Sequence, residues 1–271
     1  MKILFFCPRW GHAHLSWEDF AAKVKQSGYD GIETDVPADP GEKESLLNAL
    51  AKNGLLLIAQ HWETVTAGYQ QHYDEYCRLI ERLTEAKPLF INSQTGKDYY
   101  SFAQNKRLIK AAERISDATG VPVYHETHRG KFSFAAHITH DYLQRIDSLQ
   151  LTLDVSHWCT VAETFLHDQP DAIDMALSRT KHIHARVGFT EGPQVNDPRA
   201  PEWETALRFH LDCWDTVVNL QREKGAAYLG FTTEFGPFPY MPRQPFTQQP
   251  LADQWEVNLF MKDLLKKRYM E

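Results

Sequence analysis

The sequence has few cysteines, and they lie far apart. Cys7, Cys77, Cys159 and Cys213 are the four in 271 residues, and no C-x-x-C motif occurs. This spacing indicates neither a disulfide framework nor a thiolate zinc site. We therefore expect a protein of a reducing compartment, with the cytoplasm as its location.

Positive charge is also in short supply. Lys and Arg total 29 against 36 Asp and Glu, so the formal net charge is -7, and no Lys/Arg-rich run offsets it locally. Nucleic acid and anionic membranes are therefore disfavoured as partners. The apolar run at residues 3–7 is too short for a signal-peptide core or a membrane span. We expect a small-molecule substrate, and assembly into a homo-oligomer stays open.

Signals that would divide the chain are missing as well. No linker, low-complexity segment or repeat of 20–50 residues stands out. The G-x-G-x-x-G turn of dinucleotide-binding folds is absent. With 42% hydrophobic and 24% charged residues, the chain has enough apolar material for a sizeable core. The sequence therefore predicts a single domain over residues 1–271.

What the sequence does contain is a regular alternation of short apolar runs with longer segments of helical period, which is typical of a parallel sheet. The predicted strands are 2–7, 31–34, 55–60, 88–92, 121–126, 149–155, 182–187 and 228–234. Predicted helices between them are 16–27, 42–53, 69–85, 101–119, 135–146, 161–179 and 203–224. Eight β-α units in this length predict an α/β fold of the (β/α)8 TIM-barrel type.

Side chains alternate between the two faces of a barrel strand, so parity separates core packing from the barrel interior. In LQLTLDV the leucines share one face and Asp154 lies on the other. In HIHARV the inward set contains His184 and Arg186, and in GFTTEF it contains Glu234. Polar faces of these three strands are therefore predicted to point into the barrel.

Ligand-type residues stand near the C-terminal ends of strands five to eight, where barrel enzymes have their active sites. They are Glu126, Asp154, His184 and Glu234. Buried charges are costly unless they are paired or bind a cation. Three carboxylates and one imidazole suit a hard or borderline divalent ion, with Mn²⁺ preferred and Mg²⁺, Co²⁺ or Zn²⁺ as alternatives. The sequence thus predicts one divalent metal ion held by all four.

Six segments resemble the xylose-isomerase-like barrel superfamily, in particular sugar epimerases of the tagatose and psicose type and sugar phosphate isomerases/epimerases. They are GYDGIETD at 28–35, INSQTGKDY at 91–99, HETHRG at 125–130, LDVSHW at 153–158, HIHAR at 182–186 and TEFGP at 233–237. The resemblance implies that the second His of H-x-H is the metal ligand, which favours His184 over His182. It also implies that the two metal-bound glutamates, Glu126 and Glu234, are the catalytic acid and base.

Two further residues are candidates, His157 through the resemblance and Arg186 because it lies two residues beyond the metal-binding His. His157, in the D-x-x-H element with Asp154, resembles the family residue that faces the substrate beside the metal, and a supporting or loop-packing role is the alternative. Arg186 is a candidate to bind a substrate oxygen, or else a partner for a site carboxylate. Relatives of the epimerase type carry their arginine further along the chain, so both interpretations of Arg186 stay open.

Other polar and aromatic side chains near the strand ends are weaker candidates. His61, Asn92, Gln94, His128 and Arg129 are predicted to contact substrate hydroxyls. Trp10, Trp62 and Trp158 either stack on a sugar ring or pack. His12 and His14 suggest a second metal only weakly.

One connection is unusually long and rich in Gly, Pro and Asn. It is the segment 188–201, which follows the strand that carries His184. Long structured loops on barrels are often functional, so we expect it to cover the barrel mouth and to contribute Gln194 or Asp197 to substrate binding. The alternative is a surface insertion.

These observations together predict a divalent-metal-dependent isomerase or epimerase of a sugar or sugar phosphate. The reaction would be a proton transfer through a metal-stabilised enediolate. Alternatives are a metal-dependent lyase or dehydratase acting on a keto-sugar or keto-glycoside, an endonuclease-IV-like phosphodiesterase with more metals and more His ligands, and a binding protein that has lost catalysis. No P-loop-like cradle is present, and phosphorylated and free sugars both stay open.

Overall fold

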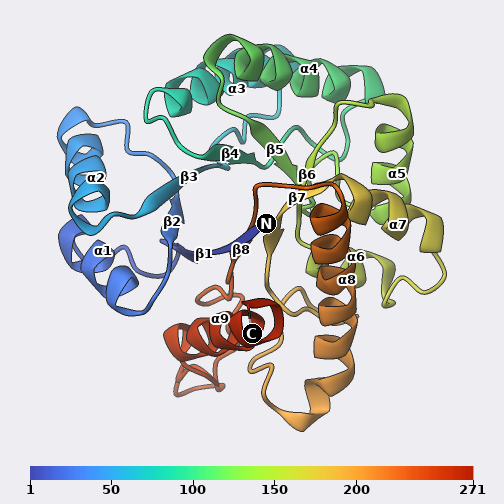
Figure 1. Ribbon diagram of the computed structural model, residues 1–271. Coiled ribbons are helices and arrows are strands. Elements are labelled where there is room, and N and C mark those ends of the chain that lie inside the picture. The colour runs from blue at the N-terminus through green and yellow to red at the C-terminus, as the bar shows by residue number, and fades with distance from the viewer. Residues whose placement is uncertain (271) are drawn as a thin grey trace.

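The computed structural model describes residues 1–270, and within them eight parallel strands close into a barrel. Each strand pairs with the next, and β8 pairs with β1. Figure 1 shows the strands around a central axis and the helices outside them. The predicted (β/α)8 TIM barrel is confirmed.

The predicted strands are all present, with bounds that differ by a few residues. They are β1 (Lys2–Pro8), β2 (Gly31–Thr34), β3 (Leu56–His61), β4 (Phe90–Ser93), β5 (Val123–Glu126), β6 (Leu151–Leu153), β7 (Thr180–His184) and β8 (Tyr228–Thr232). β5 to β8 are short, so Asp154 and Glu234 lie just beyond their strands while Glu126 and His184 end theirs.

The helices cover the outer face of the barrel. They are α1 (Trp17–Gln26), α2 (Pro40–Asn53), α3 (Tyr69–Thr84), α4 (Phe102–Thr119), α5 (Ala136–Arg145), α6 (Ser156–Ala162), α7 (Pro170–Arg179), η1 (Pro201–Trp203), α8 (Glu204–Glu223) and α9 (Gln254–Met270). Gly54 and Gly120 end α2 and α4 in the left-handed conformation that favours glycine. Among the described residues, no helix combines the length and apolarity needed to cross a membrane.

Two parts of the helical layer differ from the sequence prediction. The predicted helix 161–179 is wrong as a single helix: α6 ends at Ala162, Glu163 and Leu166 adopt positive φ, and α7 starts with Pro170 in its first turn. Because α6 begins directly after β6, His157 lies in its first turn. The sequence analysis also assigned no element to α9, which follows a long irregular connection after β8.

The barrel interior has an apolar base below the polar mouth. Phe6, Ile58 and Phe90 form a fully buried cluster of inward side chains. Beside them Gly230 leaves room for an imidazole, since a Cβ there would lie 2.6 Å from Nδ1 of His182. The larger core lies between strands and helices, as in other barrels. The apolar base supports the charged side chains of the mouth from one side.

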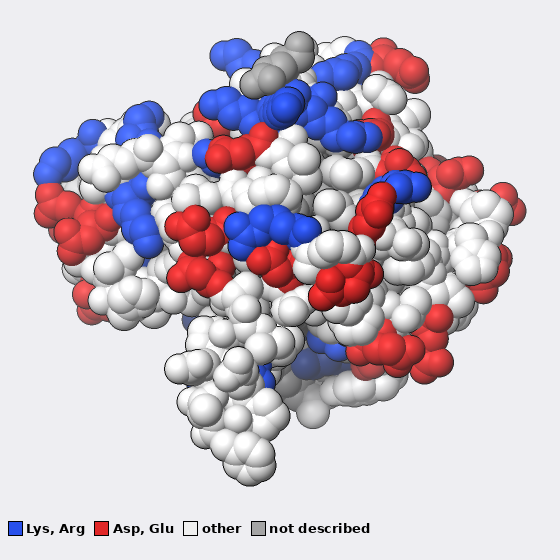
Figure 2. Space-filling view, turned by 90° about the horizontal axis from the view of Figure 1, so that it is seen from below, with Lys and Arg blue, Asp and Glu red and all other residues white. Residues whose placement is uncertain are grey.

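Charged side chains of both signs share the molecular surface. Figure 2 shows one face on which Lys and Arg are interleaved with Asp and Glu, and a lobe whose visible surface is mostly uncharged projects from it. This face therefore offers no extended surface of a single sign.

Candidate active site

The four predicted metal ligands meet at the C-terminal end of the barrel. Glu126, Asp154, His184 and Glu234 each offer one ligand atom, and these atoms all lie within 4.8 Å of one another. Each side chain comes from a different strand end, and all four are buried. Parity explains the convergence, because the polar inward faces of β5 to β8 meet at one rim.

The cluster carries more negative charge than its neighbours neutralise. Burial raises the pKa of Glu126 to about 8; His184 opposes the rise, and the negative charges of Glu234 and Asp154 add to it. Burial also raises the pKa of Asp154, although Arg186 opposes it. Crowded carboxylates of this kind are stabilised by a bound cation. This buried group of carboxylates and histidine can therefore hold a metal ion.

The orientation of His184 fits that of a metal ligand. Its Nε2 lies 3.0 Å from Oε1 of Glu33, and its Nδ1 faces Glu234 Oε2 at 2.8 Å. Burial lowers the pKa of His184, but Glu234, Glu33 and Glu126 outweigh it and hold that pKa well above its ordinary value. If a metal ion displaces the proton on Nδ1, Nε2–H still donates to Glu33 and Nδ1 is free to bind the ion. This is the usual arrangement of a carboxylate, a histidine and a metal.

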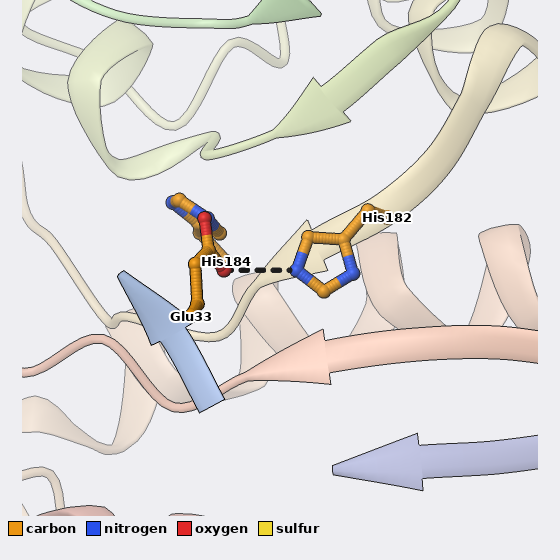
Figure 3. A group of neighbouring side chains, drawn as sticks. All are labelled: Glu33, His182 and His184. Carbon is orange, nitrogen blue, oxygen red and sulfur yellow. Dashed lines mark hydrogen bonds and ion pairs between the residues drawn. The ribbon is translucent and has the colours of Figure 1, made fainter. Parts of the chain in front are cut away.

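Glu33 on β2 is a buried site residue that the sequence analysis missed. Figure 3 shows it beside His182 and His184. Its carboxylate accepts a hydrogen bond from Asn92 Nδ2 at 2.8 Å and another from the Thr232 hydroxyl, and Nε2 of His182 lies 3.4 Å away. A parity signal was available, because Ile32 packs in the outer core and Glu33 must then face inward.

Arg186 pairs with a site carboxylate and also lines the site cavity. One guanidinium nitrogen, Nη2, forms an ion pair with Asp154 and lies 3.6 Å from Oε2 of Glu234. The same side chain forms part of the cavity wall. The structure thus shows the carboxylate pairing that was one of the two sequence interpretations, and it leaves room for substrate contact.

His128 and His157 lie against each other, with ring centroids 4.0 Å apart. His128 lines the cavity, and its Nδ1 lies 2.7 Å from the carbonyl oxygen of Arg129. His157 is fully buried behind the wall, where Nη2 of Arg186 donates to its Nε2 at 2.9 Å. The position of His157 fits the supporting role better than direct substrate contact.

His61 is not brought into the cavity, which corrects the expectation of a hydroxyl contact. It is fully buried, and its ring nitrogens are engaged by Ser93 Oγ at 3.1 Å and Thr64 Oγ1 at 2.7 Å. The reason is parity: Ile58 faces inward on β3, so Gln60 does too and His61 faces the helices. Gln60 takes the predicted place, since it lines the cavity and its Nε2 lies 3.4 Å from Glu234 Oε1.

Gln194 is likewise held away from the carboxylates. Its amide makes two hydrogen bonds to Gly236, accepting from the backbone N–H at 2.7 Å and donating to the carbonyl at 3.2 Å. It lines a second cavity of about 530 Å³ instead. Asp197 is paired with Arg199. The 188–201 loop therefore lies beside the site cavity, whose wall it does not form.

The site cavity has a volume of about 460 Å³ and opens over Glu126 and Glu234. This size is typical of a small-molecule site. Further polar wall residues are Asp35, Gln60, Gln94, His128 and Arg186. Gln94 therefore lies where the sequence predicted, and Asn92 lies deeper, with its Nδ2 3.0 Å from Glu126 Oε2.

Aromatic side chains form the outer wall. Trp10, Trp62 and Tyr240 line the cavity. Trp158 is fully buried and donates to the carbonyl of Ser133, so it packs. Tyr240 belongs to the long connection after β8 and was not predicted. Its Gly-, Pro- and Phe-rich surroundings, GPFPYMP, carried the same loop signal as 188–201.

No separate site forms around His12 and His14. His12 is buried against Phe20 and Trp255. Within residues 1–270, the other groups with metal-ligand spacing are Glu33 with His182 and His184, and Glu126 with His128 and His157. Each of these groups shares one residue with the cluster of Glu126, Asp154, His184 and Glu234: His184 in the first group and Glu126 in the second.

Comparison with known proteins decides the family. Residues 21–192, more than half of the chain, match the family described as xylose isomerase-like TIM barrel. The chain belongs to the xylose isomerase-like TIM-barrel family. The matched range contains Glu126, Asp154 and His184, while Glu234 lies beyond it and meets them in the cluster described above. No curated protein matches the sequence.

Solved structures with the same fold catalyse different reactions. The 3-keto-D-glucoside 4-epimerase YcjR from E. coli is 15% identical, with a TM-score of 0.63 over 98% of this chain and 100% of that one. The probable 3-DHS dehydratase AsbF from Bacillus anthracis is 16% identical, with a TM-score of 0.60 over 99% and 100%. Endonuclease IV from Thermus thermophilus is 14% identical, with a TM-score of 0.58 over 98% and 100%. At these identities the likeness establishes the fold, and the reaction must be argued from the site.

Proposed function

We propose that this family member is a divalent-metal-dependent isomerase or epimerase of a sugar. The observation that carries the proposal is the buried set of Glu126, Asp154, His184 and Glu234 at the base of a sugar-sized cavity. Carboxylate and imidazole donors suit Mn²⁺, the ion we propose, and Mg²⁺, Co²⁺ and Zn²⁺ are the alternatives. When bound, it would supply positive charge against the negative charge that develops on the substrate oxygens.

The two glutamates are suited to move a proton. Glu126 receives hydrogen bonds from Nδ2 of Asn92 at 3.0 Å and Nε2 of Gln94 at 3.5 Å. Glu234 faces Gln60 and Arg186, at 3.4 and 3.6 Å. Both carboxylates border the cavity. One can take the proton from the carbon beside a carbonyl, and the other can return a proton to the resulting enediolate.

The endonuclease alternative finds little support at the strand ends. A larger metal cluster would need histidine ligands from further strands, and β3 and β4 supply none, because Gln60 and Asn92 face the interior while His61 faces outward. A dehydratase or lyase is the second candidate, because its reaction begins with the same proton abstraction. It differs from the epimerase reaction in the second step, where a leaving group departs from the next carbon and no proton is returned to the first.

Proton exchange with solvent tests the proposed reaction. Protein loaded with Mn²⁺ and incubated with keto-sugars in deuterated water is expected to place deuterium on the carbon beside the carbonyl of an accepted sugar, observed by NMR. Appearance of an isomer supports isomerisation or epimerisation, whereas an unsaturated product supports the dehydratase. Phosphodiester cleavage without any sugar exchange would contradict the proposal.

Glu33 is proposed to position the metal-binding histidine. Glu33→Gln removes the acceptor charge that orients Nε2–H of His184, so Mn²⁺ affinity is expected to fall roughly 10–100-fold. Titration of the metal-free protein by calorimetry measures this, and circular dichroism checks the fold. Glu85→Gln, at an exposed carboxylate paired with Lys43, is the control and should bind as wild type. Equal affinity in Glu33→Gln would refute the role.

A further inference from the structure

The second cavity, of about 530 Å³, has no part in the proposed reaction. Residues of the 188–201 loop and Trp203 supply one part of its wall, and Pro239, Tyr240, Pro242 and Leu251 of the connection after β8 supply another. Arg129, which the sequence analysis expected to contact a substrate hydroxyl, lines this cavity and not the site cavity. Its volume is sufficient for a small molecule.

Hydrogen bonds hold the two parts of this wall in place. Gln194 is buried, and its amide pairs with both the N–H and the carbonyl of Gly236, which joins the 188–201 loop to the connection after β8. Trp203 Nε1 donates to Asn196 Oδ1 at 2.6 Å, which fixes the indole against the same loop. The cavity therefore exists before a ligand binds, and little ordering of the chain would oppose binding.

The wall is mainly aromatic and proline-rich. Phe189 and Trp203 are both partly exposed, and their ring centroids lie 4.8 Å apart. Tyr240 adds a third ring, and Pro193, Pro239 and Pro242 add surface without N–H donors. A sugar would leave most of its hydroxyls without partners on such a wall, whereas a flat aromatic ring matches it.

Arg129 supplies the charge of this cavity. Among the described residues that line it, Arg129 is the only charged one. Its Nη2 donates to the Tyr240 hydroxyl at 3.2 Å, and its Nε is buried without a hydrogen-bond partner in residues 1–270. Arg129 also forms no ion pair within that range. An unpaired guanidinium beside an apolar wall favours a carboxylate, whose two oxygens match its planar donors.

The charge of the ligand is limited by the same arginine. One guanidinium balances a monoanion such as a carboxylate. A phosphate dianion would keep one negative charge unpaired against the apolar wall, which is costly. We therefore expect a carboxylate and not a phosphate as the acidic group.

Tyr240 separates this cavity from the site cavity. It is the one described residue that lines both. Its ring meets Trp10 edge-on at 5.0 Å and lies 4.8 Å from Cζ of Arg186, while its hydroxyl accepts from Arg129. A ligand of the second cavity therefore contacts Tyr240 without reaching the carboxylates of the site.

We propose that the second cavity binds a small aromatic carboxylate, with its ring against Phe189 and Trp203 and its carboxylate on Arg129. This binding site goes beyond the proposed function. It takes no part in proton transfer and requires no metal ion, so it is tested on metal-free protein.

Four compounds test the proposal by ligand-observed NMR titration. Benzoate is expected to bind about tenfold more tightly than benzamide, which keeps the ring but lacks the charge. It should bind about fivefold more tightly than cyclohexanecarboxylate, which keeps the charge but is not planar. Phenyl phosphate, titrated as its dianion, should bind more weakly than benzoate.

Variants locate the binding site. Arg129→Gln should lower the affinity for benzoate to that for benzamide, and Arg129→Lys should weaken it only about threefold because the charge is kept. Trp203→Leu should lower it about fivefold, to the level of cyclohexanecarboxylate. Circular dichroism checks that each variant folds.

Two matched changes serve as controls. Arg243→Gln alters an exposed arginine of the connection after β8 that lies outside the cavity wall, and Arg9→Gln alters an arginine of the site cavity. Both variants should bind benzoate as wild type does.

Three results would overturn the proposal. The first is equal affinity for benzoate and benzamide, or no benzoate binding by folded wild-type protein. The second is binding that Arg9→Gln abolishes and Arg129→Gln leaves intact, because the ligand would then lie in the site cavity. The third is tighter binding of phenyl phosphate than of benzoate. None of these results bears on the proposed function, which the deuterium exchange experiment tests separately.

Discussion

Metal content is expected to fall from about one ion per chain to almost none in Asp154→Asn and in His184→Ala. Each change removes one of the four ligand atoms that would hold the ion. Asp154→Asn keeps the side-chain size but removes the charge that Arg186 pairs with. Elemental analysis of protein purified without chelator measures the effect.

An exposed histidine outside the cluster provides the control. His14→Ala should keep its metal, because His14 belongs to none of the groups with ligand spacing. Thermal unfolding with and without added Mn²⁺ shows whether each variant still folds and whether the ion stabilises it. Unchanged metal content in both Asp154→Asn and His184→Ala would remove the proposed site.

Turnover is expected to drop roughly 10²–10⁴-fold in Glu126→Gln and in Glu234→Gln, because each loses a group that accepts or donates a proton. Both residues are also proposed to hold the metal, so metal occupancy is measured on the same samples. A variant that retains its metal but no longer exchanges deuterium identifies the base. Full turnover with metal bound in both variants would show that the acid/base assignment is wrong.

Asp197→Asn is the matched control for these two changes. Asp197 is a partly exposed carboxylate of the 188–201 loop, paired with Arg199 and outside the cavity wall. Its replacement should leave turnover close to wild type. A loss comparable to that of Glu126→Gln would mean that the loop reaches the substrate after all, as the sequence analysis expected.

Strand ends and parity explain why the convergence of the four ligand-type residues could be predicted from the sequence. Apolar alternation in LQLTLDV and GFTTEF is a local property, and it orients Asp154 and Glu234 once a barrel is assumed. The same alternation along β2 and β3 places Glu33 and Gln60 on the inward face and His61 on the outward face.

The positions of loop side chains could not be predicted in the same way. Gln194 was chosen because its loop is long and follows β7, yet its amide holds the loop to Gly236. Tyr240 lines the cavity through a ring contact with Trp10, which is distant in sequence. Loop length predicts that a segment is near the mouth, but it does not say which cavity the side chains face.

The sequence by itself determined the barrel, its eight strands and the four ligand-type residues at their ends, because hydrophobic period and strand polarity act over a few residues. Only the tertiary structure decided what surrounds that cluster. Glu33 and His184 are 151 residues apart in sequence and meet because the barrel closes. Arg186 pairs with Asp154, and the amides after β7 and β8 bond to distant side chains, for the same reason. Contacts across a closed barrel depend on register and closure, which no local pattern encodes.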